Sequence, residues 1–294
     1  MKTTCVGLIA VLAAGAARAQ EGKRPPITGI AYVRIYAKDP TASQRFYTKQ
    51  VLLAEAKCPA TNCARYQIGQ DQYVEVVKAG RQTDGLQVIG FRTTDAAGLR
   101  RYLAAHDVKV PAAVEQRDDG GAEFEFADAA GHRVAFVELK ASSGEQGVIS
   151  HRLIHAGFVV RDRAAMDRLY RDILGFRPYW HGGMKPQRTD WVALQVPDGT
   201  DWLEYMLNVA PDANHHLIGV MNHFSLGVED MDATDAALQR AGWKPHGEEH
   251  KQMGLDGKYQ LNVFDPDEVR VEFMTFTPSG KPCCSDFTGP HPRP

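Results

Sequence analysis

Two histidines and two glutamates recur in this sequence at one spacing. His155 precedes Glu204 by 49 residues, and His223 precedes Glu272 by the same 49 residues. Each glutamate lies in a strongly apolar segment, DWLEYML or VRVEFMTF, where a carboxylate is costly unless it is paired or bound to a cation. Two imidazoles and two carboxylates that converge suit one divalent metal ion: Zn, Fe, Mn, Ni or Co. The alternative is that all four side chains are exposed on half-solvated strands.

The segment around His155, RLIHAGFVVRD, predicts a β-strand that leads to a helix cap at Asp162. Alternation along the strand places His155, Gly157 and Val159 on one face. The other face would carry Ile154, Ala156, Phe158 and Val160. Asp162 and Asp230 each follow their histidine by seven residues, so both histidines belong to equivalent segments.

This arrangement of strand, aspartate, amphipathic helix and further strands occurs four times. The four copies begin with IAYVRIYAKD, FRTTD, HAGFVVRD and FSLGVED. A period of roughly sixty residues is too long for a solenoid and suits βαβββ modules that complete one another's sheets. We therefore predict an α+β fold of four βαβββ modules in two domains, with cupped mixed sheets.

Composition places the boundaries of these two domains. The polar segment KASSGEQG, residues 140–147, predicts a linker over 140–149. We expect the first domain over residues 27–139 and the second over 150–277. Residues 278–294, rich in Pro, Gly and Ser, predict an irregular tail.

The first residues resemble a secretory signal peptide. Lys2 is followed by an apolar, alanine-rich run over residues 6–17 and by the small-x-small sequence Ala17-Arg18-Ala19. The run is too short to span a bilayer, and Cys5 is too early for a lipoprotein anchor. We expect a signal peptide at 1–19, export to the periplasm or the medium, and no membrane association after its removal.

The charge balance excludes one class of partner. The 294 residues carry a formal net charge of −2 and no arginine-rich or lysine-rich run. Nucleic-acid binding is therefore not expected. We predict a small-molecule substrate as the partner, and a monomer or homodimer.

Four cysteines remain after the predicted signal peptide: Cys58, Cys63, Cys283 and Cys284. Export favours disulfides, and four cysteines allow three connectivities. Cys58 and Cys63 bracket a short turn and form the favoured local pair. An adjacent pair would be strained, so the alternatives are that Cys283 or Cys284 reaches another part of the fold, or that the cysteines bind metal.

Together these features resemble the vicinal oxygen chelate superfamily, which includes glyoxalase I, extradiol dioxygenases, methylmalonyl-CoA epimerase and bleomycin or fosfomycin resistance proteins. The resemblance spans residues 27–277, and FDPDEVRVEF at 264–273 is similar to the family's last-strand motif. One departure is Glu268, where that turn usually carries glycine. The resemblance implies paired βαβββ modules that form a cup, with ligands from the first and last strand of each module.

The resemblance also assigns the ligand positions. In the second domain they are His155, Glu204, His223 and Glu272. In the first domain they are Tyr32, Glu75, Val88 and Ala135, of which three cannot bind a metal in the usual way. The first domain is therefore expected to lack a metal, an asymmetry that extradiol dioxygenases share.

Three functions follow from the resemblance, and we expect an enzyme. In the first, Glu204 or Glu272 is both ligand and general base, for isomerase, epimerase or lyase chemistry through an enediolate on a substrate with adjacent oxygens. In the second, His155, His223 and Glu272 hold Fe(II) for ring-cleaving dioxygenation. Glu204 opposes that function because it would crowd an open position, and Tyr259 is out of the expected register. In the third, the protein binds a small molecule or an antibiotic without turnover.

Between helix and strand of the third module lie side chains that would line the cup. They are Tyr179, Trp180, His181, Arg188 and Trp191. A glycine pair after His181 would let this segment flex over a substrate. The alternative is a loop with packed aromatic side chains.

Overall fold

The computed structural model describes residues 22–59, 62–80, 85–140, 144–185, 187–245 and 250–294. The predicted signal peptide at 1–19 lies outside the described residues. No helix among them is long and apolar enough to cross a membrane.

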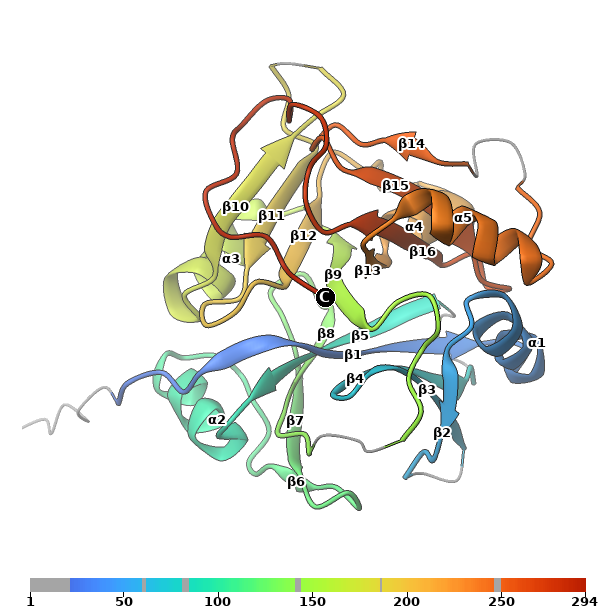
Figure 1. Ribbon diagram of the computed structural model, residues 1–294. Coiled ribbons are helices and arrows are strands. Elements are labelled where there is room, and N and C mark those ends of the chain that lie inside the picture. Colours follow the sequence, from blue (N-terminus) through green and yellow to red (C-terminus); the bar gives the residue numbers. More distant parts are fainter. Residues whose placement is uncertain (1–21, 60–61, 81–84, 141–143, 186, 246–249) are drawn as a thin grey trace, which may run out of the picture.

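Two eight-stranded sheets form the molecule (Figure 1). The first has the order β2-β3-β4-β1-β5-β8-β7-β6, and the second the order β10-β11-β12-β9-β13-β16-β15-β14. The first contains β1 Ile27–Ala37, β2 Ala54–Ala56, β3 Cys63–Gly69, β4 Gln72–Lys78, β5 Gly85–Thr93, β6 Glu115–Gln116, β7 Ala122–Ala127 and β8 Arg133–Val137. The second contains β9 Arg152–Val159, β10 Arg177–Gly182, β11 Trp191–Gln195, β12 Trp202–Met206, β13 His223–Val228, β14 Gln252–Met253, β15 Tyr259–Phe264 and β16 Arg270–Thr275. The α+β fold of two domains with cupped mixed sheets is confirmed.

Each predicted helix begins at its aspartate. The helices are α1 Pro40–Arg45 continued by η1 Phe46–Gln50, α2 Ala96–Ala105, α3 Arg163–Asp167 continued by η2 Arg168–Ile173, and α5 Met231–Arg240. The carboxylates of Asp39, Asp95, Asp162 and Asp230 all accept hydrogen bonds from backbone N–H groups of the first turn. These caps are confirmed. The additional helix α4, His215–Met221, is capped by Asn214 just before β13.

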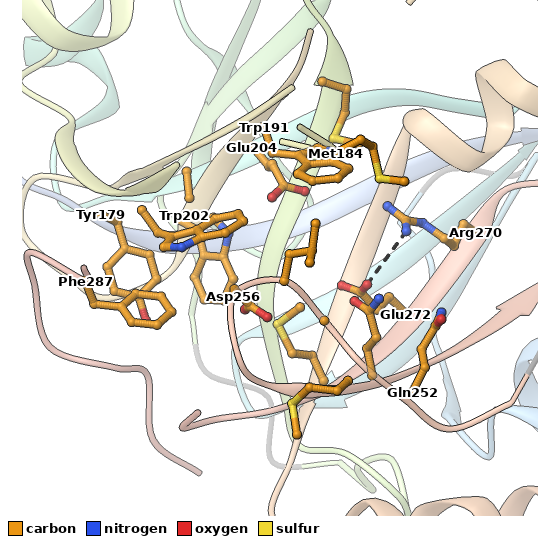
Figure 2. Close-up of a pocket in the computed structure, with 18 residues that line it drawn as sticks. Tyr179, Met184, Trp191, Trp202, Glu204, Gln252, Asp256, Arg270, Glu272 and Phe287 are labelled. Carbon is orange, nitrogen blue, oxygen red and sulfur yellow. Dashed lines mark ion pairs between the residues drawn. The ribbon is translucent and has the colours of Figure 1, made fainter. Parts of the chain in front are cut away.

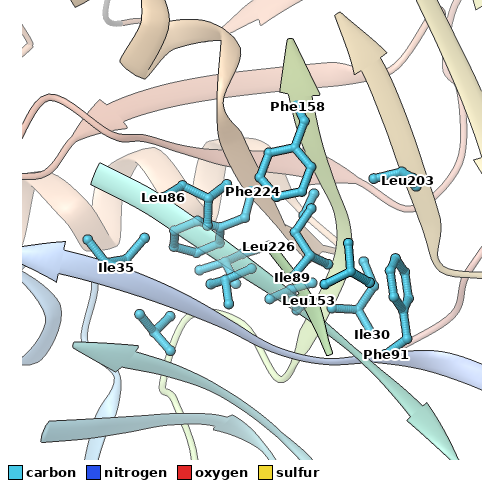
Figure 3. Close-up of a cluster of buried hydrophobic side chains, with 14 of the residues drawn as sticks. Ile30, Ile35, Leu86, Ile89, Phe91, Leu153, Phe158, Leu203, Phe224 and Leu226 are labelled. Carbon is cyan, nitrogen blue, oxygen red and sulfur yellow. The ribbon is translucent and has the colours of Figure 1, made fainter. Parts of the chain in front are cut away.

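One hydrophobic core joins the two sheets. Figure 3 shows Ile30, Ile89 and Phe91 of the first sheet against Leu153 and Phe224 of the second, and all five are buried in a single cluster. The sheets therefore share their apolar packing. The cup of the second sheet keeps a separate small cluster, which includes Trp202, Tyr179 and Met274.

Two matching hydrogen bonds also connect the halves. The hydroxyl of Tyr47 donates to Asp265 at 3.0 Å, and the hydroxyl of Tyr170 donates to Asp128 at 3.2 Å. In both cases the tyrosine belongs to the helical segment of one sheet and the aspartate to a turn of the other. Each domain therefore depends on a residue of its neighbour.

Strand β9 departs from simple alternation at Ile154. A register shift in the pairing of β9 with β13 separates Leu153 from His155. Ile154 then packs with Tyr179 and Trp202 in the cup, whereas Ala156 and Phe158 pack in the shared core. The prediction that Ile154 shares a face with Ala156 was wrong, because a bulge adds a residue that alternation does not anticipate.

Candidate metal centre

The register of the central strands brings the predicted ligands together. Gly157 on β9 lies between Glu204 on β12 and His223 on β13. In the neighbouring row, Ser225 on β13 lies between His155 and Glu272. Directly opposed residues of a sheet project from the same face, so all four side chains extend into the cup of the second sheet.

Distances within this cluster are short. The Nε2 atoms of His155 and His223 are 3.0 Å apart. Glu272 Oε2 lies 3.2 Å from His155 Nε2, and Glu204 Oε2 lies 3.2 Å from His223 Nε2. Ligand atoms of His155, His223 and Glu272 all lie within 4.8 Å of one another. Glu204 therefore lies beside, and not within, the group of three residues whose ligand atoms are closest together.

Both imidazole rings are fixed from behind. The Nδ1 atom of His223 lies 2.9 Å from the carbonyl oxygen of Met221, so an Nδ1–H donates there and leaves the Nε2 lone pair toward the cup. Burial, together with the charge of Arg270, lowers the pKa of His223 and keeps the ring neutral. The ring of His155 stacks on Trp202 with 4.6 Å between centroids.

Gly157 is required by the position of His223. A Cβ atom at residue 157 would lie 2.7 Å from Cε1 and 3.1 Å from Nδ1 of His223. A side chain at 157 would therefore displace the imidazole. The glycine on the histidine face of β9 makes room for the second histidine.

The two carboxylates are ionised despite their burial. Burial opposes ionisation of Glu272, but the contact with His155 and the charge of Arg270 lower its pKa to about 2. Burial also opposes ionisation of Glu204, but the contacts with His223 and His155 lower the pKa of this side chain below its usual value. Two imidazole rings and two carboxylates form a suitable set of donors for a divalent cation.

Unused polar atoms in the cluster also fit a cation. Ser225 Oγ and Glu272 Oε2 are buried and have no hydrogen-bond partner within the described residues, apart from the 3.2 Å contact of Glu272 Oε2 with His155 Nε2. A buried carboxylate oxygen without a donor is costly, and a metal ion would satisfy it. The donor set therefore fits the predicted metal. The assignment of the four residues as ligands stays a prediction.

A cavity of about 280 Å³ opens beside the cluster (Figure 2). Of the residues predicted to line the cup, Tyr179, Trp180 and Trp191 do so. His181 is exposed and its backbone N–H donates to Ser285, while Arg188 is exposed and pairs with Asp190 at 2.7 Å. Neither belongs to the cavity lining. A role for this group in substrate binding stays a prediction.

Three side chains near the cavity were missed in the sequence. Arg270 and Asp256 line the cavity, and Lys258 lies fully buried behind it with Nζ 4.5 Å from the ring of Trp202. Burial raises the pKa of Asp256 to about 6 and lowers the pKa of Lys258 to about 8. Arg270 was detectable, because it precedes Glu272 by two residues and so faces the same side of the strand. No sequence pattern around Lys258 indicates that this side chain is buried behind the cavity.

Residues 283–291, here the C-terminal segment, form part of the cavity wall. The indole N–H of Trp180 donates to the carbonyl of Cys283, and the N–H of Thr288 donates to the carbonyl of Tyr179. The ring of Phe287 packs on Tyr179 with 4.9 Å between centroids and lines the cavity. The segment lies along β10 in Figure 1.

Both pairs of cysteines form disulfides. Cys58 is bonded to Cys63, which confirms the favoured local pair. Cys283 is bonded to the adjacent Cys284 and not to another part of the fold. Bonded sulfurs leave no thiolate for a metal at these four residues.

The first cup contains an arginine in place of metal ligands. Arg34 lies opposite Glu75 and Val88 in the first sheet, as Gly157 lies opposite Glu204 and His223 in the second. Its guanidinium pairs with Glu75 at 2.6 Å and with Glu125 at 2.8 Å. Glu75 is therefore a buried ion-pair partner and not a surface charge.

Comparison with protein families agrees with the resemblance. Residues 152–273 match the family model described as Glyoxalase/Bleomycin resistance protein/Dioxygenase superfamily. No curated protein matches the chain. The predicted resemblance to the vicinal oxygen chelate superfamily is confirmed.

Several solved structures share the fold. An extradiol ring-cleaving dioxygenase from B. fuscum is 17% identical with a TM-score of 0.64, over 89% of this chain and 74% of that chain. A Mn(II)-bound glyoxalase from Novosphingobium aromaticivorans is 17% identical with a TM-score of 0.69, over 89% and 86%. The 2,3-dioxygenase LapB from Pseudomonas sp. KL28 is 15% identical with a TM-score of 0.69, over 92% and 96%. At these identities the likeness concerns the fold.

Proposed function

Since residues 152–273 match the model of the glyoxalase, bleomycin resistance protein and dioxygenase superfamily, we propose that the protein is a metal-dependent enzyme acting on a small substrate with adjacent oxygens. His155, His223 and Glu272 hold one divalent metal, and Glu204 is the general base. The reaction is an isomerisation, an epimerisation or an elimination that begins with removal of a proton from carbon.

The position of Glu204 carries this proposal. Both carboxylates line the cavity, but the side chain of Glu204 is 14% exposed and that of Glu272 only 3%. Glu204 is also not part of the three residues whose ligand atoms lie closest together. A carboxylate at the edge of a metal site and open to the cavity can reach a substrate proton.

The residues divide the chemistry between them. A bound divalent ion supplies Lewis-acid stabilisation of negative charge on the substrate oxygens. Glu204 is ionised, so it can accept a proton from the carbon beside a substrate carbonyl. Trp191 and Trp202 line the same cavity and help to exclude water from the reacting carbon.

Metal analysis of the purified mature protein tests the proposal. We expect close to one divalent metal per chain, and loss of that metal in His223→Ala. Absence of stoichiometric metal in both proteins would overturn the proposal of a metal-dependent enzyme. It would favour a protein that binds a small molecule or an antibiotic without turnover.

Ring-cleaving dioxygenation is a second candidate. Two histidines and one carboxylate within 4.8 Å of one another are the set that holds non-haem Fe(II) with open positions. Oxygen uptake by the Fe(II)-loaded protein with a panel of catechols separates the two reactions. Oxygen uptake together with a ring-cleaved product would show that the reaction is dioxygenation and not proton abstraction.

We also propose that the protein is exported to the periplasm or the medium. The two disulfides support this location, because disulfides persist in oxidising compartments. N-terminal sequencing of the protein from the cell envelope and medium should give a start near Gln20. A start at Met1 in the cytoplasmic fraction would contradict export.

A further inference from the structure

Arg270 has hydrogen-bonding capacity that the protein does not use. Its side chain is only 13% exposed and lines the cavity beside Glu272 (Figure 2). The ion pair between Nη1 and Glu272 Oε1 measures 3.7 Å, which is longer than a hydrogen bond, and Nε has no partner within the described residues. A guanidinium has five N–H donors in a planar fork, and burial makes each unused donor costly. The donors of Arg270 therefore suit a ligand in the cavity.

The charge of Arg270 points to an anionic ligand. Glu272 is its one ion-pair partner in the described part of the chain, and Glu272 is a proposed ligand of the metal. A divalent cation would share the negative charge of this carboxylate and would also repel the guanidinium. A buried charge that loses its partner is destabilising. An anionic group on the substrate would pair with the guanidinium of Arg270 and compensate its buried charge.

The rest of the cavity wall combines apolar side chains with a few polar ones, Gln252, Asp256 and Gln260. The apolar part of the lining includes Trp191, Trp202, Met184, Met206 and Met274. Aromatic side chains can stack on a flat apolar body, and thioethers can pack around it. The volume of about 280 Å³ restricts the ligand to a small molecule.

We propose that Arg270 binds a carboxylate of the substrate, so that the enzyme acts on small organic acids. The carboxylate is separate from the two adjacent oxygens that face the metal, and a flat apolar body connects them. A planar carboxylate matches the two parallel N–H donors of a guanidinium. This inference rests on the proposed function, because it takes the metal as the site of the adjacent oxygens.

A pair of matched ligands tests the inference. Zn(II)-loaded protein is titrated with 3,4-dihydroxyphenylacetate and with its methyl ester, and binding is followed by tryptophan fluorescence and by calorimetry. The wild type should bind the acid about tenfold to a hundredfold more tightly than the ester, as charge-assisted hydrogen bonds imply. Arg270→Gln should lose this preference while its affinity for the ester stays within about twofold. Arg270→Lys should retain only part of it.

Controls separate the role of Arg270 from that of the metal. Arg163→Gln removes a half-exposed arginine that pairs with Asp167 outside the cavity, and it should behave as the wild type. Zinc content is measured in every variant, and Arg270→Gln should keep it. Equal affinity for acid and ester in the wild type, or equal loss of both in Arg270→Gln, would overturn the inference and leave the proposed function standing. Failure of both ligands to bind in a zinc-dependent manner would overturn both.

Discussion

At the scale of single residues, the two carboxylates of the candidate site differ in position. Glu272 lies beside His155 and is 3% exposed, whereas Glu204 lies beside His223 and is 14% exposed, although both line the cavity. Both are ionised, so charge alone does not distinguish their roles. Exposure does, because a base must reach the substrate and a ligand need not.

Glutamine substitutions separate the ligand from the base. Glu204→Gln should retain metal but lose activity by about a hundredfold or more, the usual contribution of a general base. Glu272→Gln should lose metal, and activity with it. Metal content and turnover are measured on the same preparations. Loss of metal in Glu204→Gln together with full retention in Glu272→Gln would exchange the two assignments.

Gly157 provides a second test at this scale. Alanine would place a Cβ atom 2.7 Å from Cε1 of His223 and so move that ring. We expect Gly157→Ala to weaken metal affinity about tenfold to a hundredfold, as loss of ligand orientation does elsewhere. Gly80→Ala, where a Cβ atom meets nothing within 4 Å, is the control. Competition with a metal-binding dye measures both, and unchanged affinity in Gly157→Ala would contradict the argument.

At the scale of elements, the turn before β16 connects the two domains. Asp265 accepts hydrogen bonds from the backbone N–H groups of Asp267 and Val269 and from the hydroxyl of Tyr47. Asp128 occupies the same place opposite Tyr170. The sequence placed each tyrosine eight residues after its capping aspartate, but not the partner of its hydroxyl, because that partner lies in the other domain.

Removal of the Tyr47 hydroxyl should weaken both domains together. Tyr47→Phe leaves a buried acceptor on Asp265 without its donor, so we expect a loss of about 1–3 kcal/mol in the free energy of unfolding. Urea unfolding measures this difference. Tyr259→Phe is the control, because no hydrogen bond to the Tyr259 hydroxyl occurs within the described residues and this side chain is half-buried. Equal stability of the two variants would contradict the prediction.

Asp265 should also give the protein a pH-dependent stability. Burial raises the pKa of this carboxyl from 3.8 to about 6. Between about pH 4 and pH 6 the carboxyl is therefore protonated in the folded state and ionised in the unfolded chain. The stability gained from binding this proton is lost as the pH rises through about 6. Relative to Asp265→Asn, the wild type should lose stability between about pH 4 and pH 6 and change little above pH 7. Thermal unfolding across this range measures the difference, and a gain with rising pH would contradict it.

Local patterns predicted the elements well and the side-chain environments less well. The aspartate caps, the equal 49-residue steps and the alternation around Glu272 all involve neighbours within one module or its copy. Arg34 and Lys258 depend on contacts between strands that are distant in sequence, and nothing beside them marks such contacts. The bulge at Ile154 belongs to strand pairing, which a single strand does not encode.

At the scale of the whole molecule, the two cups have different contents. The second holds the candidate metal ligands, and the first holds the guanidinium of Arg34 between Glu75 and Glu125. Arginines of the chain itself pair with these carboxylates: Arg34 with both, Arg65 with Glu75 and Arg133 with Glu125. We therefore expect about one metal per chain and not two, with the first domain stabilised by its arginine.

Loss of Arg34 should destabilise the first domain. Arg34→Met breaks two largely buried ion pairs and leaves Glu75 with Arg65 at 3.5 Å and Glu125 with the half-exposed Arg133, so we expect a loss of about 3 kcal/mol. Arg133→Met is the matched control, because Arg133 also pairs with Glu125 but is 46% exposed, so its loss should cost about 1 kcal/mol or less. Urea unfolding compares the two. Similar losses would contradict a special role for Arg34.

The C-terminal segment has a consequence for how the protein is made. All four candidate ligands lie before residue 273, but Phe287 and the hydrogen bonds of Cys283 and Thr288 come afterwards. A ribosome adds these residues after every strand of both sheets. A growing chain therefore has its complete set of ligands before it has a closed cavity, and synthesis stopped at residue 277 would leave the cup without the wall that Phe287 supplies.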